Sequence, residues 1–267
     1  MDDPPGDVAT SRDALLGGRL LLRQPVKGHR VGSDAILLAA AAPAKDVTRL
    51  VDVGAGVGAV GLAVLQRLTG ASADLVEQDA QLAALARENA ARNGLEAQSR
   101  IVRVDLMDAR ARRAAGLANG AADLVVTNPP FFEAQSGRVS PDANRASAHV
   151  FPAKAPGDPG APPLESWIVA CLALLGAGGR FVMIHRPEAL AQILSAIARR
   201  LGSVAILPIH PRAGAPAHRI LIAGKKGARG PIRLLAGFVL HDSSGAFTPW
   251  AEAVHRGEAL IDWGEGR

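Results

Sequence analysis

Short apolar runs alternate with segments of helical periodicity through most of the chain. The runs end next to glycine, proline or acidic residues, as buried strands do. The predicted strands are Leu50–Val53, Ala73–Glu77, Arg100–Val104, Asp123–Thr127, Arg180–His185, Val204–Leu207 and Arg219–Ala223, with Leu234–Leu240 as a candidate for a further strand. The predicted helices are Ala59–Leu68, Ala80–Asn93, a short basic helix to about Ala115, Leu164–Leu175 and Glu188–Leu201.

Strands that alternate with helices in this way indicate an α/β fold. We expect a Rossmann-like, seven-stranded, mostly parallel sheet with helices on both faces. Ligands of such sheets bind at the carboxyl ends of the strands, near the point where the strand order reverses. The residues that follow each predicted strand are therefore the first candidates for chemistry.

The segment before the first core strand has a different character. Residues 1–18 are rich in Asp, Pro, Gly and Ser and are expected to form a frayed leader. A short strand is predicted over Leu20–Gln24. Ser33 and Asp34 then begin a helix that continues through the apolar run Ala35–Ala42.

The pattern divides the chain into two parts. Residues 1–45 are predicted to form an N-terminal extension and residues 46–267 the main domain. Within the domain, residues 133–163 carry Gly, Pro, Ser and Asp and are predicted to form a long loop. Loops of that length are usually functional or mobile.

Composition narrows the class of protein. The 267 residues are 48% hydrophobic and 21% charged, which is ordinary for a globular protein. No apolar run approaches the ~18 residues of a membrane span, and the acidic, polar start is unlike a secretory signal. Cys171 is the single cysteine, so an internal disulfide and a cysteine-built metal site are excluded. These features predict a cytoplasmic protein.

The distribution of charge is more informative than the net charge of +5. No acidic residue occurs between Glu188 and Asp242. That stretch holds Arg199, Arg200, Arg212, Arg219, Lys225, Lys226, Arg229 and Arg233. Such asymmetry indicates a polyanion partner, although a solvated basic face gives the same pattern. The chain has no Tyr and few other aromatic residues, which disfavours an extended platform for stacking single-stranded bases.

A glycine-rich turn follows the first core strand. Gly54, Gly56 and Gly58 lie at every second position of the segment Val51–Gly58. Without Cβ atoms, they allow a ligand to approach the backbone closely. The segment Gly56–Gly61 also fits the G-x-G-x-x-G fingerprint of dinucleotide-binding proteins, so the turn alone does not identify the ligand.

Three acidic residues at strand ends favour a sulfonium cofactor over a dinucleotide. Asp52 lies where a carboxylate can meet an amino group and would repel a pyrophosphate. Glu77 ends the second core strand, in the right place to bind two ribose hydroxyls. Asp105 follows the third strand and can accept a hydrogen bond from an adenine amino group. Helix capping would be a purely structural explanation of Glu77 and Asp105.

The segment Asn128-Pro129-Pro130-Phe131 follows the fourth core strand. The two prolines fix an extended turn and leave carbonyl groups available as acceptors. An exocyclic amine conjugated to a base is a poor nucleophile. The Asn128 side-chain oxygen and the Pro129 carbonyl can accept its two hydrogens and so direct the nitrogen lone pair toward a methyl donor, while Phe131 stacks on the planar group. No strong base and no metal are required.

These motifs resemble the N-P-P-[FY] branch of class I methyltransferases, over about residues 48–223. More narrowly, the chain resembles the bacterial adenine-specific N6-methyltransferases that modify the base beside the anticodon of valine tRNA. The narrower resemblance rests on Gln24–Leu38, on Asn128–Phe132 with Ala146–His149, and on Pro211–Arg219 with Gly224–Gly227. The family often has Ala-Arg-His-Glu at 146–149, and the Pro-Gly-rich stretch 152–163 is longer than expected.

The resemblance implies a class I methyltransferase fold with S-adenosylmethionine as cofactor and an adenine exocyclic amine of tRNA as substrate. The implied cofactor-binding residues are Asp34, Asp52, Gly54, Gly56, Glu77 and Asp105, with the N-terminal extension closing over the cofactor. The implied catalytic residues are Asn128, Pro129, Pro130 and Phe131. The expected contacts to tRNA are Arg212, Arg219, Lys225 and Lys226.

Other functions fit parts of the same pattern. A protein glutamine methyltransferase would use the same corner for an amide nitrogen, but such enzymes usually carry a helical N-terminal domain. An rRNA guanine methyltransferase of this branch often has a duplicated domain. A dinucleotide-dependent oxidoreductase fits only the segment Gly56–Gly61, without a matching catalytic pair. A non-catalytic RNA-binding module would not need the Asn128 corner.

Overall fold

The computed structural model describes residues 9–27, 30–43, 46–129 and 164–264. Its strands are β1 (Thr10–Leu15), β2 (Leu20–Pro25), β3 (Arg49–Val53), β4 (Ser72–Glu77), β5 (Ser99–Arg103), β6 (Ala122–Thr127), β7 (Leu175–His185), β8 (Leu201–Arg212), β9 (Arg219–Lys226), β10 (Arg233–Leu234) and β11 (Phe238–His241). Its α-helices are α1 (Ser33–Ala41), α2 (Ala59–Leu65), α3 (Ala80–Arg92), α4 (Ala109–Ala114), α5 (Leu164–Leu174), α6 (Leu190–Ile197) and α7 (Pro249–His255). Short 3-10 turns are formed by Leu16–Gly18 and Pro187–Ala189.

One sheet organises the molecule. Its strand order is β10-β8-β9-β7-β6-β3-β4-β5, with β11 also paired to β8. β9 is antiparallel to β7 and β8, and the other pairings in this sheet are parallel. The chain runs outward from β3 through β4 to β5 and then crosses to β6 on the other side of β3. The strand order therefore reverses between β3 and β6, where a ligand is expected.

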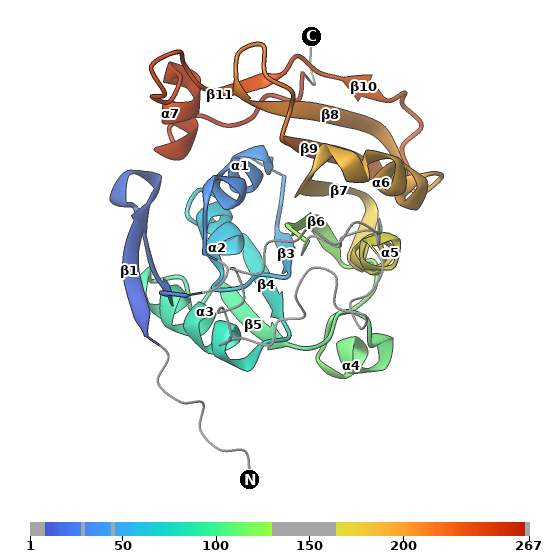
Figure 1. The fold of residues 1–267 in the computed structure, drawn as a ribbon. Helices are drawn as coiled ribbons and strands as arrows, with labels where there is room; N and C mark the ends of the chain where they lie inside the picture. The colour runs from blue at the N-terminus through green and yellow to red at the C-terminus, as the bar shows by residue number, and fades with distance from the viewer. Residues whose placement is uncertain (1–8, 28–29, 44–45, 130–163, 265–267) are drawn as a thin grey trace, which may run out of the picture.

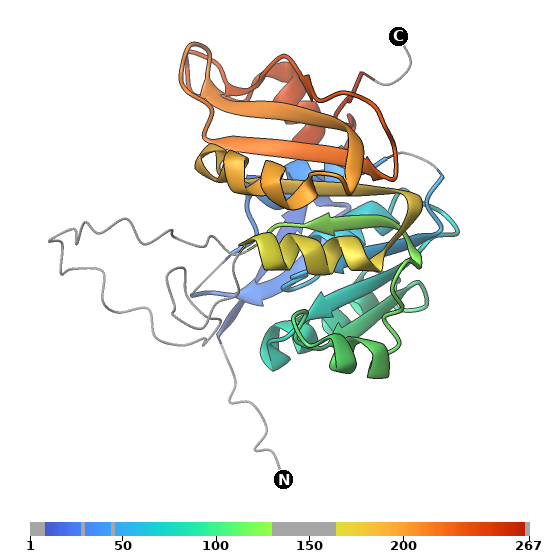
Figure 2. The same cartoon turned by 90° about the vertical axis from the view of Figure 1, so that its right-hand side faces the viewer.

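The helices cover both faces of this sheet. Figure 1 shows the strands stacked from β8 at the top to β5 below, with α1, α2 and α3 on one side and α4, α5 and α6 on the other. Turned by 90°, Figure 2 shows α5 and α6 lying across one face of the strands. Each face has its own apolar cluster, one around α1, α2 and α7 and one around α5 and α6. The predicted α/β class is confirmed.

The structure departs from the prediction at the edges. The sheet has nine strands in the described residues rather than seven, because the short β10 and β11 add to β8. Strands β7 and β8 also begin earlier than predicted, in segments whose glycines and polar residues hide the apolar pattern. The predicted long loop, residues 133–163, lies outside the described residues.

The prediction of a frayed leader over residues 1–18 is wrong for Thr10–Gly18. β1 pairs antiparallel with β2, and the turn Leu16–Gly18 joins them. The sequence Thr-Ser-Arg-Asp-Ala-Leu has few apolar residues, since β1 is only partly buried. The hairpin is held to α3 by side chains: the Asn89 amide oxygen accepts from the Arg23 backbone and the Asn93 amide oxygen from the Leu21 backbone.

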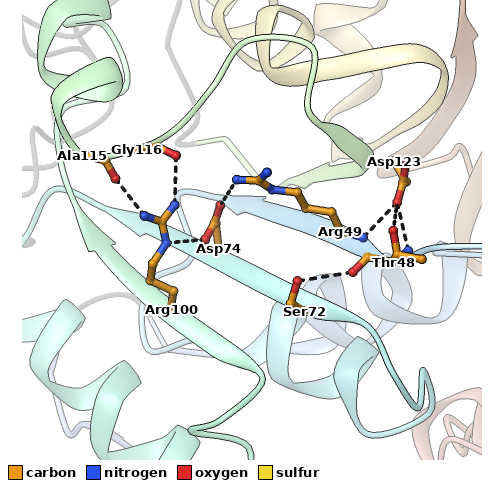
Figure 3. A network of polar contacts seen from close by, with 8 residues as sticks. All are labelled: Thr48, Arg49, Ser72, Asp74, Arg100, Ala115, Gly116 and Asp123. Atoms are coloured by element: carbon orange, nitrogen blue, oxygen red, sulfur yellow. Dashed lines mark hydrogen bonds and ion pairs between the residues drawn. The ribbon is translucent and has the colours of Figure 1, made fainter.

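A polar network ties the strands together at the edge opposite the predicted ligand site (Figure 3). The Asp74 carboxylate accepts from Arg100 at 2.7 Å and from Arg49 at 3.5 Å. Asp123, beside the start of β6, accepts from the backbone and hydroxyl of Thr48. These contacts fix the amino ends of β3 to β6 and leave the carboxyl ends for chemistry.

Candidate active site

The three glycines after β3 are required for different reasons. Gly54, Gly56 and Gly58 all have left-handed φ angles, of 73°, 57° and 86°. A Cβ atom at Gly58 would press on the core side chains Leu62 and Leu75. A Cβ atom at Gly56 would meet nothing within 4 Å. The backbone at Gly56 is therefore open to a ligand, as a cofactor loop requires.

Glu77 reaches this loop from the end of β4. Its Oε2 accepts a hydrogen bond from the Gly56 backbone at 2.8 Å, and its Oε1 accepts one from the Asp79 backbone at 2.9 Å. The side chain is largely buried, and burial raises the pKa of Glu77 although the backbone donors act in the opposite direction. The structure thus brings Glu77 and Gly56 together, as predicted for one cofactor site.

Asp52 points into the sheet–helix layer. Its carboxylate is 1% exposed and accepts from the Gly61 backbone in the first turn of α2 at 2.8 Å. Burial raises the pKa of Asp52 to about 7, the Gly61 hydrogen bond lowers it, and the charge of Glu77 raises it further. The contact anchors α2 to β3, a role that the sequence did not indicate.

Asp105 lies two positions beyond the end of β5, at the same edge of the sheet. Its side chain is exposed and accepts from the Met107 backbone at 2.8 Å. The carboxylate therefore shapes the turn before α4 and keeps an oxygen at the surface. Glu77 and Asp105 follow neighbouring strands, in the order that the ribose and adenine of one nucleoside would need.

The catalytic corner follows β6, on the other side of β3. Asn128 is half-buried, and Pro129 is buried. Among the described residues, the Asn128 side chain has no hydrogen-bond partner. Pro130 and Phe131 lie outside the described residues, as do Phe132 and Ala146–His149. The part of the corner that is described thus lies at the reversal of strand order with an amide available.

Asp34 and Arg219 meet at this edge too. The Arg219 guanidinium donates from Nε to the Asp34 carboxylate at 2.8 Å, and from Nη1 to the His218 carbonyl at 2.8 Å. Arg212, at the end of β8, is exposed at the same edge of the sheet. The first turn of α1 is therefore joined to the edge where the ligand is expected.

The other two predicted RNA contacts lie at the opposite edge. Lys225 on β9 pairs with Arg180 on β7, and Arg180 pairs in turn with Leu124 near the start of β6. Lys225 therefore lies toward the amino ends of the parallel strands, because β9 runs antiparallel to β7. Lys225 is exposed. Lys226 is half-buried and donates from Nζ to the Leu172 and Leu175 carbonyls at 2.7 and 2.6 Å, which caps the end of α5. The four residues do not form one surface.

Sequence reasoning missed two residues that adjoin the corner. Trp167, on α5, donates from Nε1 to the Thr127 hydroxyl at 3.0 Å. Thr127 is completely buried and donates to the Val53 carbonyl at 2.9 Å. Both lie on elements adjacent to the glycine loop. The only signal in the sequence was that Trp is rare in this chain, and that does not place a residue.

Two comparisons bear on the family. A family model described as methyltransferase small domain matches residues 29–145. A protein of Aeromonas salmonicida (strain A449), named tRNA1(Val) (adenine(37)-N6)-methyltransferase, is 31% identical over 223 residues, which are 82% of this chain and 85% of that protein. The chain belongs to the family of the tRNA1(Val) (adenine(37)-N6)-methyltransferases. The enzymes of the family take their methyl group from S-adenosylmethionine, the cofactor that the sequence predicted.

Solved structures agree on the fold of this methyltransferase. A protein of Agrobacterium tumefaciens described as a predicted O-methyltransferase, Atu636, is 31% identical, covers 85% of this chain and 98% of its own, and has a TM-score of 0.69. M. jannaschii TYW2 in complex with AdoMet is 12% identical, covers 84% of this chain and 89% of its own, and has a TM-score of 0.54. At that identity it supports the fold alone. The two relatives that are 31% identical carry names that imply different acceptor atoms.

Two features are missing from the part of the chain that the structure describes. No group of three or more His, Cys, Asp and Glu side chains there could hold a metal ion. Within the same residues, no helix is long and apolar enough to cross a membrane.

Proposed function

We propose that this methyltransferase transfers a methyl group to the exocyclic amine of an adenine in tRNA, the base beside the anticodon of valine tRNA. The observation that carries the proposal is the place of Asn128. Asn128 directly follows β6, whose last residue Thr127 pairs with Val53 just before the glycine loop, and its side chain has no hydrogen-bond partner among the described residues. The name of the Aeromonas salmonicida relative supports the substrate.

The residues of the loop fit the nucleoside and amino-acid parts of the cofactor. Gly56 leaves the backbone open, and Glu77 places a buried carboxylate at the same point. In the proposal, Glu77 holds the ribose hydroxyls and Asp105 the adenine amine, while Asp52 and Gly54 line the amino-acid end. Asp34 closes over the cofactor from α1. When bound, S-adenosylmethionine supplies an electrophilic methyl group on a sulfonium sulfur.

The corner of the chain then acts on the nitrogen. The Asn128 oxygen and the Pro129 carbonyl accept the two hydrogens of the amine. Pro130 is proposed to help fix the turn, and Phe131 is proposed to stack on the base. These acceptors hold the lone pair in the direction of attack. They bind more strongly as positive charge grows on nitrogen, so they favour the transition state. The surplus proton then passes to water.

We propose that basic residues at two opposite edges of the sheet contact RNA. Arg212 and Arg219 lie at the same edge of the sheet as the corner, on β8 and β9, and are proposed to bind phosphates near the target base. Lys225 is exposed at the opposite edge of the sheet, and Arg199, Arg200 and Arg229 are exposed as well. A backbone hydrogen bond from Gly227 to the Arg200 carbonyl joins the segments that carry these residues. Lys226 caps α5, so its share of RNA binding is the smallest of the four. A tRNA-modifying reaction would take place in the cytoplasm.

The division of the chain is also a proposal. We place an N-terminal extension at residues 1–45 and the methyltransferase domain at 46–267. The ion pair between Asp34 and Arg219 supports an extension that reaches the cofactor edge. The hairpin of β1 and β2 supports the same arrangement, because the Asn89 amide that binds Arg23 also donates to the Val57 carbonyl in the glycine loop.

One experiment tests the substrate. Purified valine tRNA, the remaining tRNA, rRNA and a protein extract from a strain lacking the enzyme are each methylated in vitro, digested to nucleosides or amino acids and analysed by mass spectrometry. We expect N6-methyladenosine in valine tRNA. A methyl group on a ribose or other hydroxyl would support an O-methyltransferase, methylguanosine from rRNA a guanine methyltransferase, and methylglutamine from protein a glutamine methyltransferase. Binding of NAD but not S-adenosylmethionine in calorimetry would support an oxidoreductase.

A further inference from the structure

Trp167 bridges the two halves of the proposed site. Its Nε1 donates to the Thr127 hydroxyl at 3.0 Å, and that hydroxyl donates to the Val53 carbonyl at 2.9 Å. Thr127 is the last residue of β6, directly before Asn128, and Val53 is the last residue of β3, directly before Gly54. One indole is therefore linked by hydrogen bonds to both strand ends at the reversal of strand order.

The indole also packs on the cofactor loop. A Cβ atom at Gly54 would lie 3.2 Å from Cζ2 and 3.5 Å from Cη2 of Trp167. The ring thus covers the side of Gly54 that any other residue would fill, while Gly54 has the left-handed φ of 73°. Contact of this kind resists movement of the loop toward α5. Trp167 itself is only half-buried, so the residue keeps some solvent-accessible surface.

We propose that Trp167 is a positioning residue that fixes the separation between the cofactor loop and the Asn128 corner. This inference rests on the proposed function, because it concerns the distance between donor and acceptor groups. A methyl transfer requires the two to be in line, and a displacement of about 1 Å can cost about 100-fold in rate. Thr127 is the link: it is buried, and its hydroxyl serves as acceptor for Trp167 and donor for Val53.

Paired variants separate positioning from simple packing. Trp167→Phe keeps an aromatic ring and removes the N–H donor, and Thr127→Val removes the hydroxyl with little change of volume. Thr127→Ser keeps the hydroxyl and is the conservative rescue. Trp250→Phe, at a 52% exposed position on α7, is the matched control for removal of a tryptophan. The assays are single-turnover methyl transfer to tRNA, thermal melting, and tryptophan emission during titration with S-adenosylhomocysteine.

We expect Trp167→Phe and Thr127→Val each to slow the methyl-transfer step by about 10- to 100-fold. The double variant should be no slower than the worse single variant, because both break the same link. Thr127→Ser and Trp250→Phe should react at the wild-type rate. S-adenosylhomocysteine should change the emission of wild type and Trp250→Phe but not that of Trp167→Phe.

Three results would overturn the inference: wild-type single-turnover rates in a folded Trp167→Phe protein, additive rate reductions in the double variant, or an emission change that persists without Trp167. A fall in melting temperature without a kinetic defect would assign Trp167 to packing alone. If wild type methylates no tRNA, the proposed function fails instead. The emission titration then still decides whether Trp167 adjoins the cofactor loop, because it needs no substrate.

Discussion

Arg219 binds Asp34 across 185 positions of the chain, with Nε and the carboxylate oxygen 2.8 Å apart. The pair joins the first residue of β9 to the first turn of α1, and each side chain is about a quarter exposed. The sequence predicts that Asp34 serves the cofactor and that Arg219 serves RNA. In the free protein the two charges compensate each other, so a phosphate that approaches Arg219 competes with Asp34.

The variant Asp34→Asn tests both roles. We expect weaker binding of S-adenosylmethionine, because α1 loses the contact that joins it to β9 at the edge proposed to bind the cofactor. Binding of tRNA should be at least as tight as in wild type, since the Arg219 charge is no longer offset by Asp34. An ion pair of this exposure contributes about 0–1 kcal/mol, so the melting temperature should change little. Unchanged cofactor affinity together with weaker tRNA binding would contradict both roles of the Asp34–Arg219 pair. The control is Glu258→Gln, which removes the exposed ion pair between Glu258 and Arg256.

The basic residues at the two opposite edges of the sheet can be tested separately for RNA binding. Removing one contact to a phosphate should reduce the slope of log affinity against log salt by about 0.7 to 0.9. We expect this reduction for Arg212→Ala and for Lys225→Ala, without a change in cofactor affinity. Lys226→Ala should chiefly lower the melting temperature, because its Nζ caps α5. The control is Arg92→Ala, at an exposed position on α3. If Arg212→Ala and Lys225→Ala show the same salt dependence of RNA affinity as Arg92→Ala, neither residue contacts RNA phosphates.

Asp52 makes stability depend on pH. Its pKa is raised from 3.8 to about 7 in the folded protein. The native state therefore binds more protons than the unfolded state within this window, and stability falls as pH rises from about 4 to about 7. Asp52→Asn keeps an oxygen for the Gly61 donor and carries no charge.

We expect Asp52→Asn to flatten the pH dependence of the melting temperature and to be more stable than wild type at pH 8, by on the order of 4 kcal/mol or less. Melting curves between pH 5 and pH 9 measure the effect. Equal pH profiles for the two proteins would show that Asp52 does not titrate in this window. If the carboxylate also binds the amino group of the cofactor, calorimetry at pH 8 should show weaker S-adenosylmethionine binding by the stable variant.

Glu77 supports both the loop and the cofactor in the proposed site. Glu77→Ala removes the acceptor for Gly56 and leaves two ribose hydroxyls unpaired, at a cost of roughly 1–3 kcal/mol. That corresponds to about a 5- to 150-fold decrease in S-adenosylmethionine affinity. Glu77→Gln, which keeps one acceptor oxygen, should weaken binding less. Calorimetry that finds wild-type affinity in a folded Glu77→Ala protein would exclude the ribose role.

The sequence predicted the layers of the fold, and it predicted that most of the candidate site residues lie at one edge of the sheet, because both follow from local pattern. The apolar strands end at Glu77 or directly before Gly54 and Asn128, which places these three residues at one edge because the strands are parallel. Contacts between distant segments leave no such trace. Trp167 and Thr127 are 40 positions apart, and neither belongs to a motif. The polar strand β1 and the inward direction of Asp52 depend on neighbours that only the fold supplies.

Asn128 is the centre of the proposed mechanism. Removal of one preorganised hydrogen-bonding group of this kind costs on the order of 10²- to 10³-fold in rate, by analogy with oxyanion-hole donors. Asn128→Ala should slow the methyl-transfer step by about that factor. Cofactor affinity should stay near that of wild type, because the residues proposed to hold the cofactor follow other strands. Asn128→Asp should be milder, since a carboxylate still accepts the amine hydrogens.

Single-turnover methyl transfer by Asn128→Ala to tRNA, measured beside a melting curve, tests the mechanism most directly. We expect a folded protein with near-normal binding of S-adenosylmethionine and a methyl-transfer step slower by about 10²- to 10³-fold. If Asn128 only stabilises the turn before Pro129, the melting temperature falls while the folded fraction reacts normally. A stable Asn128→Ala protein that methylates tRNA at about the wild-type rate would contradict the catalytic role of this corner.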